Sequence, residues 1–202
     1  MNLVLEDVED IAPIVLHPPA MDDDEFYDFC QRFDKGLRVE RMADGCVVIM
    51  APAGFESSFR NSNLTAQLAV WAERDGRGAA FDSNTEFFLP DGSAFGPDAA
   101  WVVWERIRKL TPKQKRKFAR LCPDFIIELM SPSDRMAQAQ RKMQLWIDNG
   151  VLLGWLIDAD RRTVTIYRPS AEPEVLENPD QIAGEGPVAG FVLDLKNIWA
   201  GL

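Results

Sequence analysis

Apolar and polar positions follow several different periods along the chain, and each period predicts a type of element. Apolar residues recur every three or four positions over residues 22–33 and 58–74, which indicates two amphipathic helices. Between these helices, apolar runs at 37–42 and 46–50 predict two strands, and Asp44-Gly45 predicts their hairpin turn because glycine accepts positive φ. Further strands are predicted near 85–89, 99–104, 124–130, 152–158, 163–168 and 191–193, and further helices over 111–120, 134–149 and 195–199.

The order of these elements predicts the fold class. It is typical of an α/β or mixed α+β protein in which a mixed β-sheet is flanked by helices. Residues 1–20 are expected to form an extended arm, because Pro13, Pro18 and Pro19 disfavour helix there. No internal repeat is visible and no linker separates two cores, so residues 21–202 are expected to form a single domain.

Composition narrows the class of protein. The hydrophobic fraction of 47% and the charged fraction of 27% are ordinary for a globular protein. No run of about 18 apolar residues exists, which argues against a membrane-spanning helix. The first ten residues are acidic and lack the basic start and apolar run of a signal peptide, so a cytoplasmic location is expected.

The cysteines and the histidine exclude several kinds of site. Cys30, Cys46 and Cys122 are odd in number and widely spaced, which argues against a disulfide framework or a cysteine-type zinc site. His17 is the only histidine, so a serine–histidine–aspartate triad or a histidine-based zinc site is hard to build. The ligands of any metal site would be carboxylates and carbonyls, which suit Mg²⁺ or Mn²⁺.

The net charge of −10 is unevenly distributed. Residues 1–28 hold nine acidic and no basic residues, whereas 106–120 hold eight basic and no acidic residues. The basic run can contact a phosphate backbone, or it can be a solvated helix face that keeps the protein soluble, and the pattern favours neither. The candidate contacts with nucleic acid are Arg106, Lys109, Lys113, Arg116, Lys117 and Arg120.

Two carboxylates are candidates for the chemistry. Glu128 lies inside the apolar run 125–130, where a buried carboxylate is costly unless it is paired or binds a metal. A structural ion pair with an arginine is the alternative. Asp98 follows Pro97 at the mouth of the predicted strand 99–104, where a capping role is the default. Paired at neighbouring strand ends, the two could hold a divalent ion and leave sites for water and phosphate.

Other residues are weaker candidates. Lys142 borders the apolar stripe of its helix, so its stem could deliver the ammonium to the carboxylates. Glu40 alternates with apolar neighbours and could face inward, or it could pair on the surface with Arg38 or Arg41. Helix capping is the usual explanation for two further polar residues at the start of the second helix, Ser58 and Asn61.

Several segments carry a resemblance to a known family: RVERMADGCVVIMAPAG, FDSNTEFFLPDGSAFGPDAAWV, LTPKQKRKFARLCPDFIIELMSPSD, RKMQLWIDNGVLLGWLID, VTIYRP and GFVLDLKNIW. On them the chain resembles the Uma2 (DUF820) family of restriction-endonuclease-like proteins, in the PD-(D/E)XK nuclease superfamily. The resemblance covers roughly residues 22–200. It implies a mixed sheet between helices.

The resemblance also implies the acidic motif at Asp98 and Glu128, with Glu40 as an auxiliary acid. The superfamily often places a lysine two residues after its second acid. Met130 occupies that position here, and the resemblance implies that Lys142, on the following helix, supplies the lysine instead.

These expectations combine into a magnesium- or manganese-dependent endonuclease acting on DNA. Asp98, Glu128 and the carbonyl of Leu129 would hold the metal, Lys142 would assist the attacking water or the transition state, and Glu40 would tune the metal or its water shell. A homodimer is expected, because cleavage of both strands usually needs two sites. The alternatives are a catalytically silent nucleic-acid-binding or regulatory protein, a hydrolase of another phosphate ester, and a protein that acts through its oligomer.

Overall fold

The computed structural model describes residues 13–32, 37–132 and 134–202. Its largest layer is a six-stranded sheet in the order β11-β10-β9-β8-β7-β4. Strands β8 and β9 are parallel, and the other neighbours are antiparallel, which confirms the predicted mixed sheet. Its strands are β4 (Gly78–Asp82), β7 (Ala99–Val103), β8 (Phe125–Leu129), β9 (Leu153–Asp158), β10 (Thr163–Tyr167) and β11 (Glu174–Glu177).

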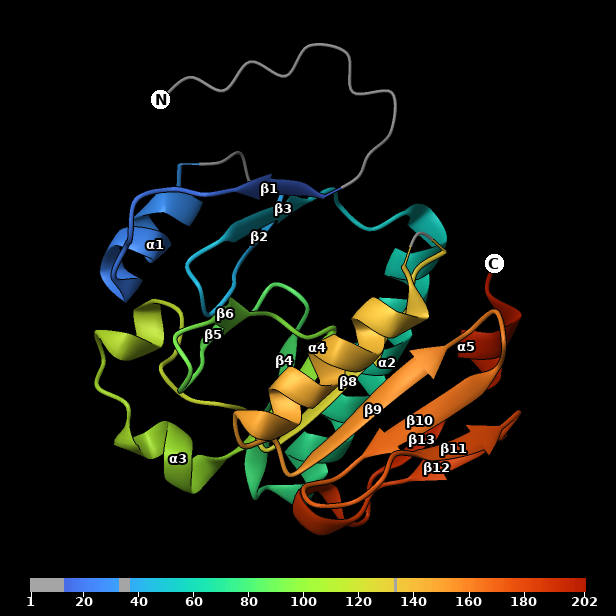
Figure 1. Cartoon of the computed structure of the whole chain (residues 1–202). Helices are drawn as coiled ribbons and strands as arrows, with labels where there is room; N and C mark the ends of the chain where they lie inside the picture. The colour runs from blue at the N-terminus through green and yellow to red at the C-terminus, as the bar shows by residue number, and fades with distance from the viewer. Residues whose placement is uncertain (1–12, 33–36, 133) are drawn as a thin grey trace.

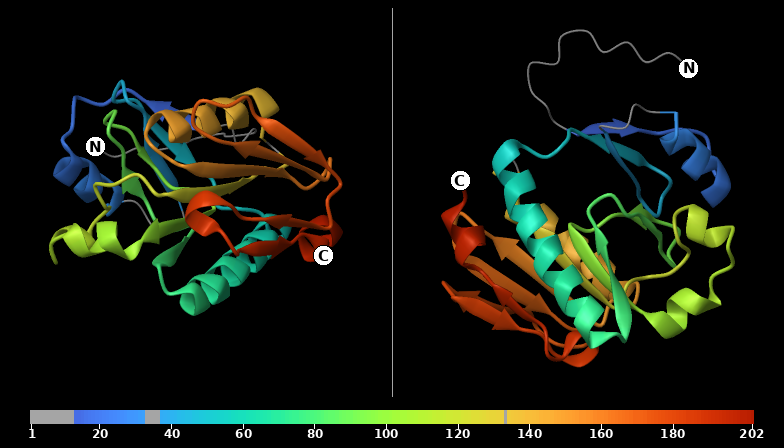
Figure 2. Two further views of the ribbon diagram at one scale, coloured as in Figure 1. Left: turned by 90° about the horizontal axis from the view of Figure 1, so that it is seen from below. Right: turned by 180° about the vertical axis from the view of Figure 1, so that it is seen from behind.

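Two long helices cover opposite faces of this sheet, as the views in Figures 1 and 2 show. Helix α2 (Phe55–Asp75) packs Leu64 and Leu68 on one face. Helix α4 (Met136–Asp148) packs Met143 and Trp146 on the other. The α2 face is also covered by the C-terminal elements β12 (Gln181–Ala183), a 3₁₀ turn η2 (Gly186–Val188), β13 (Val192–Asp194) and α5 (Lys196–Ala200).

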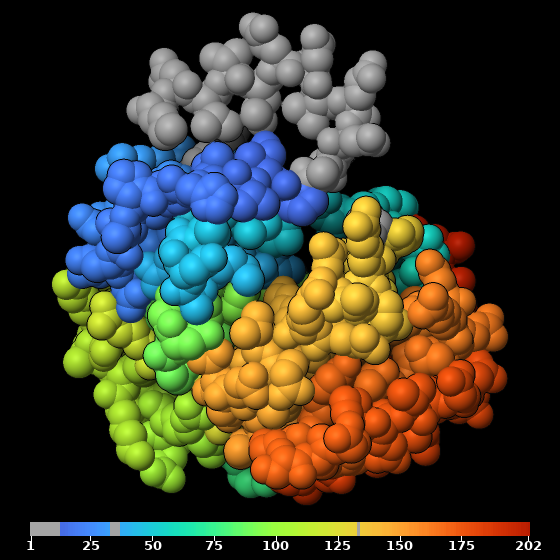
Figure 3. All heavy atoms as spheres, viewed as in Figure 1, coloured from blue at the N-terminus to red at the C-terminus, as the bar shows by residue number. Residues whose placement is uncertain are grey.

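A second, five-stranded sheet lies beside α4, in the order β1-β3-β2-β6-β5. It has its own apolar cluster around Phe26, Val39 and Phe88. The space-filling view shows this N-terminal part of the chain next to the gold helix α4 (Figure 3). The strands of this sheet are β1 (Ile14–Leu16), β2 (Arg38–Arg41), β3 (Val47–Met50), β5 (Phe87–Phe88) and β6 (Ala94–Phe95), and helix α1 (Asp23–Cys30) packs in the same cluster.

The N-terminal expectations were partly correct. Asp22 caps α1 in a capping box with Glu25, as the sequence indicates. The predicted end of this helix at residue 33 lies outside the described residues. Part of the expected arm is a strand, because β1 pairs with β3, and residues 1–12 lie outside the described part of the chain. Helix α2 begins at Phe55, with Gly54 as its N-cap, and not at Ser58.

The predicted basic helix over 111–120 was wrong. Helix α3 (Trp104–Lys109) comes earlier and takes the last residue of the predicted strand 99–104, and residues 111–120 form no α-helix but only a 3₁₀ turn, η1 (Gln114–Arg116). The physical reason is that this run has no apolar stripe to bury, while its like charges repel one another. Residues 170–189 form β11, β12 and η2.

Candidate active site

Asp98 and Glu128 meet because of the register of β7 and β8. Ala99 pairs with Ile127 and Ala100 with Ile126, so the same register places Asp98 across from Glu128. Side chains alternate along a strand, and Ala100 and Ile126 pack on the α4 face. Asp98 and Glu128 therefore lie on that same face.

Hydrogen bonds fix the orientation of the Asp98 carboxylate. Its Oδ2 accepts from the backbone N–H of Leu129 at 2.7 Å, and its Oδ1 accepts from Nδ2 of Asn61 at 3.1 Å. The side chain is buried, with 7% of the residue exposed. Asn61 comes from α2, so the helix on the far face of the large sheet still reaches the site at its N-terminal end.

Glu128 receives two donors from a single turn of α4. Nε1 of Trp146 donates to its Oε1 at 2.8 Å, and Nζ of Lys142 lies 3.1 Å from the same oxygen. Lys142 and Trp146 are four residues apart, which places them on one side of the helix. Of the two predicted carboxylates, the structure places the Lys142 ammonium beside Glu128.

The smaller sheet contributes two further charged groups. Arg38 and Glu40 are two residues apart on β2, so both point away from the core position of Val39 and toward α4. Lys142 donates a hydrogen bond of 2.9 Å to Oε1 of Glu40. The Arg38 guanidinium lies 3.2 Å from Glu40 and 3.7 Å from Asp98. Glu40 thus faces inward, and its ion pair with Arg38 is part of the same cluster.

Sequence reasoning missed Glu86 as a site residue. This residue precedes the two-residue strand β5, and its Oε2 is buried without a hydrogen-bond partner among the described residues. Burial, followed by the negative charge of Glu40, raises the pKa of Glu86 to about 8. The signal in the sequence is weak, because a strand of two residues gives no alternation from which to assign its faces.

The other ionisable groups of the cluster influence one another. Burial raises the pKa of Glu40, but Lys142 and Arg38 outweigh burial and hold this pKa below its ordinary value. The pKa of Glu128 is raised, because burial and the neighbouring Asp98 outweigh Lys142. Burial alone would lower the pKa of Lys142, yet Glu128 and Glu40 raise it. Lys142 is therefore a firmly protonated ammonium at neutral pH.

The donor chemistry of this cluster fits a hard divalent cation, since carboxylate oxygens are the ligands that Mg²⁺ prefers. Within residues 13–32, 37–132 and 134–202, however, no three His, Cys, Asp or Glu side chains converge as a preformed metal site. Two carboxylates, Asp98 and Glu128, with water completing the coordination, match the way Mg²⁺ is usually held. The fit is thus to a largely hydrated ion.

Of the two polar candidates at the start of the second helix, Asn61 and Ser58, only Asn61 contacts a site residue. Asn61 touches Asp98, whereas Ser58 is exposed within the first turns of α2 and is not its cap. Leu129 touches Asp98 through its N–H; a metal-ligand role for its carbonyl stays a prediction.

Most of the predicted phosphate contacts are ion-paired. The structure pairs Lys117 with Asp24 at 2.8 Å and Arg120 with Asp23 at 2.9 Å, so the acidic helix α1 covers part of the basic run. Five of the six predicted basic contacts have such a partner in the described part of the chain: Arg106 with Asp124, Lys109 with Glu105, Lys113 with Asp24, and the two already named. Arg116, on η1, lies near α1, where its carbonyl accepts from Tyr27 at 3.4 Å.

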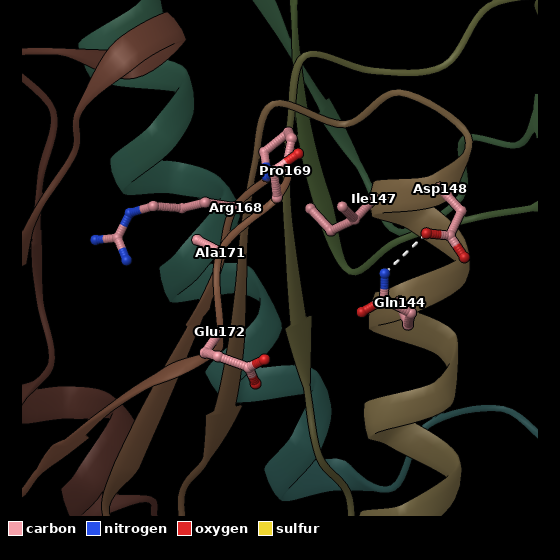
Figure 4. A pocket seen from close by; sticks show the side chains of 8 residues that line it. Gln144, Ile147, Asp148, Arg168, Pro169, Ala171 and Glu172 are labelled. Carbon is pink, nitrogen blue, oxygen red and sulfur yellow. Dashed lines mark hydrogen bonds between the residues drawn. The ribbon is translucent and has the colours of Figure 1, made fainter.

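A pocket of about 470 Å³ lies elsewhere, between α4 and the loop after β10 (Figure 4). Gln144 and Asp148 of α4 line it and bond to each other at 2.8 Å. Arg168 on the other wall is paired with Glu174 and Glu185. None of the predicted site residues lines this pocket.

Comparisons with known proteins bear on the fold and the family. The model of the Uma2 family, described as "Putative restriction endonuclease", matches residues 23–196. A solved structure described as "a putative nuclease belonging to DUF820 from Anabaena variabilis" aligns with a TM-score of 0.71 and 23% identity, over 90% of this chain and 98% of the other. No curated protein matches the chain. Among the described residues, no helix is long and apolar enough to cross a membrane.

Proposed function

The chain belongs to the Uma2 family, and from this premise we propose that it is a metal-dependent endonuclease that hydrolyses phosphodiester bonds in DNA. The observation that carries the proposal is the convergence on Glu128. Asp98 lies opposite it, Lys142 lies 3.1 Å away, and Lys142 in turn contacts Glu40. Buried, interacting ionisable groups of this kind are typical of active sites.

Asp98 and Glu128 would hold Mg²⁺ or Mn²⁺, with the carbonyl of Leu129 as a further ligand. When bound, such an ion polarises the scissile phosphate and lowers the pKa of a bound water. The bonds from Asn61 and from the Leu129 N–H to Asp98 would keep that carboxylate in one orientation. The Trp146 indole would do the same for Glu128.

Lys142 would act through its charge. Its pKa is raised by Glu128 and Glu40 in spite of burial, so it is a poor general base at neutral pH. A fixed ammonium at this position would stabilise the negative charge that develops on the phosphoryl oxygens in the transition state. Glu40 would hold the ammonium in place through their 2.9 Å hydrogen bond.

The basic run would be the contact with the DNA backbone, and two copies of the chain would cleave the two strands. The ion pairs of this run with α1 imply that part of it must exchange carboxylate partners for phosphates. Analytical sedimentation of the purified chain would test whether it forms a homodimer.

The test is plasmid cleavage at low salt, with Mg²⁺ and then Mn²⁺, by the wild type and Asp98→Asn. We expect nicking or linearisation that needs the metal and falls at least ~10²-fold in the variant. Asp148→Asn is the matched control, because Asp148 is exposed on the far side of α4 and should leave cleavage unchanged.

One observation favours the second candidate function, a catalytically silent nucleic-acid-binding protein. Lys142 and Arg38 already neutralise the carboxylates of the cluster, as cations can in a site that has lost its metal. Wild-type cleavage no greater than that of Asp98→Asn, with either metal, would move the assignment to this candidate.

A further inference from the structure

Arg38 occupies a position in the site that ion pairing alone does not explain. It lies on β2 at the border of the two sheets, with its side chain 26% exposed. Glu40 and Asp98 are its nearest carboxylates, at 3.2 Å and 3.7 Å. Burial works to lower the pKa of Arg38, and these two acids raise it, so the guanidinium is a permanent cation.

The guanidinium has donors to spare. Nε and Nη2 are both buried and donate no hydrogen bond to any protein group in the described part of the chain. The contact of Nε with Glu40 is close enough for charge attraction but is not aligned as a hydrogen bond. Buried donors without acceptors cost free energy, so native proteins seldom keep them unless a ligand or solvent accepts from them.

The two unpartnered nitrogens lie along the same edge of the planar group. Their N–H bonds run nearly parallel, and this fork matches two oxygens of a phosphate or one oxygen shared between both donors. Gly96 lies beside this edge, where an added Cβ would come within 3.5 Å of Nη2 and 2.7 Å of the Thr85 carbonyl. Gly96 therefore adds no side chain to this buried edge, which the Glu86 side chain and the Thr85 carbonyl adjoin.

We propose that the Nε/Nη2 edge of Arg38 binds the non-bridging oxygens of the substrate phosphodiester, and so positions it against Asp98 and Glu128. This assignment rests on the proposed nuclease function. Arg38 and Lys142 then approach the phosphoryl group with two cations, one from β2 and one from α4. The competing explanation is that Arg38 serves only as a counter-ion for the buried carboxylates.

The test is an NMR titration with dimethyl phosphate, the smallest phosphodiester, in buffer containing Mg²⁺. The Nε–H signal of Arg38 is observed directly and is identified by its loss in Arg38→Lys. We expect dimethyl phosphate to shift this signal in the wild type. The backbone amide signals, which both proteins retain, give the affinity, and we expect it to fall by about tenfold or more in Arg38→Lys, which keeps the charge but not the fork. Arg161→Gln, which changes an arginine that is 67% exposed, is the matched control and should bind like the wild type.

Two results would overturn the proposal: equal affinity in folded Arg38→Lys and wild type, or binding of inorganic phosphate but not of the diester. Arg38→Gln, which removes the charge as well, is a second comparison. If Arg38→Gln does not fold, the comparison of Arg38→Lys with the wild type decides whether the proposal holds. Failure of the nuclease proposal is distinguishable. If the chain binds the diester through Arg38 but cleaves no plasmid, the nuclease proposal alone is refuted. If the wild type cleaves plasmid and Arg38→Lys binds the diester as tightly as the wild type, the Arg38 assignment alone is refuted.

Discussion

Trp146 donates its indole N–H to Oε1 of Glu128 at 2.8 Å, and this bond joins α4 to the central strand β8. Lys142, one turn earlier, approaches the same oxygen. The helix therefore delivers both a neutral donor and a cation to one carboxylate oxygen, and the orientation of Glu128 depends on how α4 packs.

Trp146→Phe should separate orientation from packing. Phenylalanine keeps much of the apolar volume but cannot donate, and we expect cleavage to fall by about 10–100-fold, as for other residues that orient a metal ligand. Trp155→Phe is the matched control, because Trp155 is equally buried but packs on the opposite face of the large sheet. A similar loss of melting temperature in both variants with a loss of cleavage only in Trp146→Phe is the expected result. Equal cleavage rates would contradict it.

Removal of Lys142 should cost stability as well as activity. Lys142→Gln leaves Glu128 buried without its ion-pair partner and leaves Glu40 with Arg38 alone, and breaking such a buried pair typically costs about 3–5 kcal/mol. The loss should shrink at acidic pH, where the two carboxylates become protonated and need no partner. Chemical denaturation at neutral and acidic pH measures it, and a double variant with Glu40→Gln should recover part of the stability.

Glu86 should make the protein less stable as pH rises. Its pKa in the folded state is about 8, above the ordinary 4.5, so between these values the folded state binds more protons than the unfolded state. Stability from this group is therefore full below about pH 4.5 and is lost as pH rises through about 8.

Glu86→Gln mimics the protonated carboxyl and should flatten this decline, with a higher melting temperature than the wild type above pH 8. Thermal melts across the pH range measure the difference between the two proteins, which cancels the other titrating groups. Parallel curves would show that the pKa of Glu86 is the same in the folded and unfolded protein.

The acidic helix α1 should weaken DNA binding by occupying basic side chains. In the variant Asp24→Asn with Asp28→Asn, Lys117 loses both its carboxylate partners and Lys113 loses one. We expect tighter binding to a labelled duplex and a steeper salt dependence, with log K falling by a further ~0.9 per log unit of salt for each phosphate gained. Asp160→Asn, an exposed site on the β9–β10 turn, is the control. Unchanged binding would show that the basic run does not touch DNA.

The positions of the two central acids could be inferred from the sequence because their signals are local. A carboxylate inside an apolar strand indicated Glu128, and Asp98, a capping candidate by itself, gained its importance from pairing with Glu128. The candidate role of Lys142 was inferred from its place at the border of an apolar stripe and from the family resemblance. Their meeting in one cluster is what the structure adds.

Other features depended on contacts that no local pattern records. Glu86 and Arg38 join the site only because the smaller sheet packs beside α4. Thr111-Pro112 is a good helix start signal, but the residues after it have no apolar face to bury, so the helix predicted over 111–120 does not form. The prolines of the predicted arm disfavour helix, but they do not exclude the edge strand β1.

The border between the two sheets has a thermodynamic consequence. Lys142–Glu40 and Arg38–Asp98 are ion pairs between the smaller sheet and the body formed by α4 and the larger sheet. Phe87 of β5 and Phe95 of β6 pack in one cluster with Met143 and Trp146 of α4, but α1 and strands β1 to β3 pack in a separate cluster. These N-terminal elements can therefore open as a cooperative unit while the larger sheet stays folded. Such partial opening would dismantle the site and expose its acids, so heat inactivation should precede global melting.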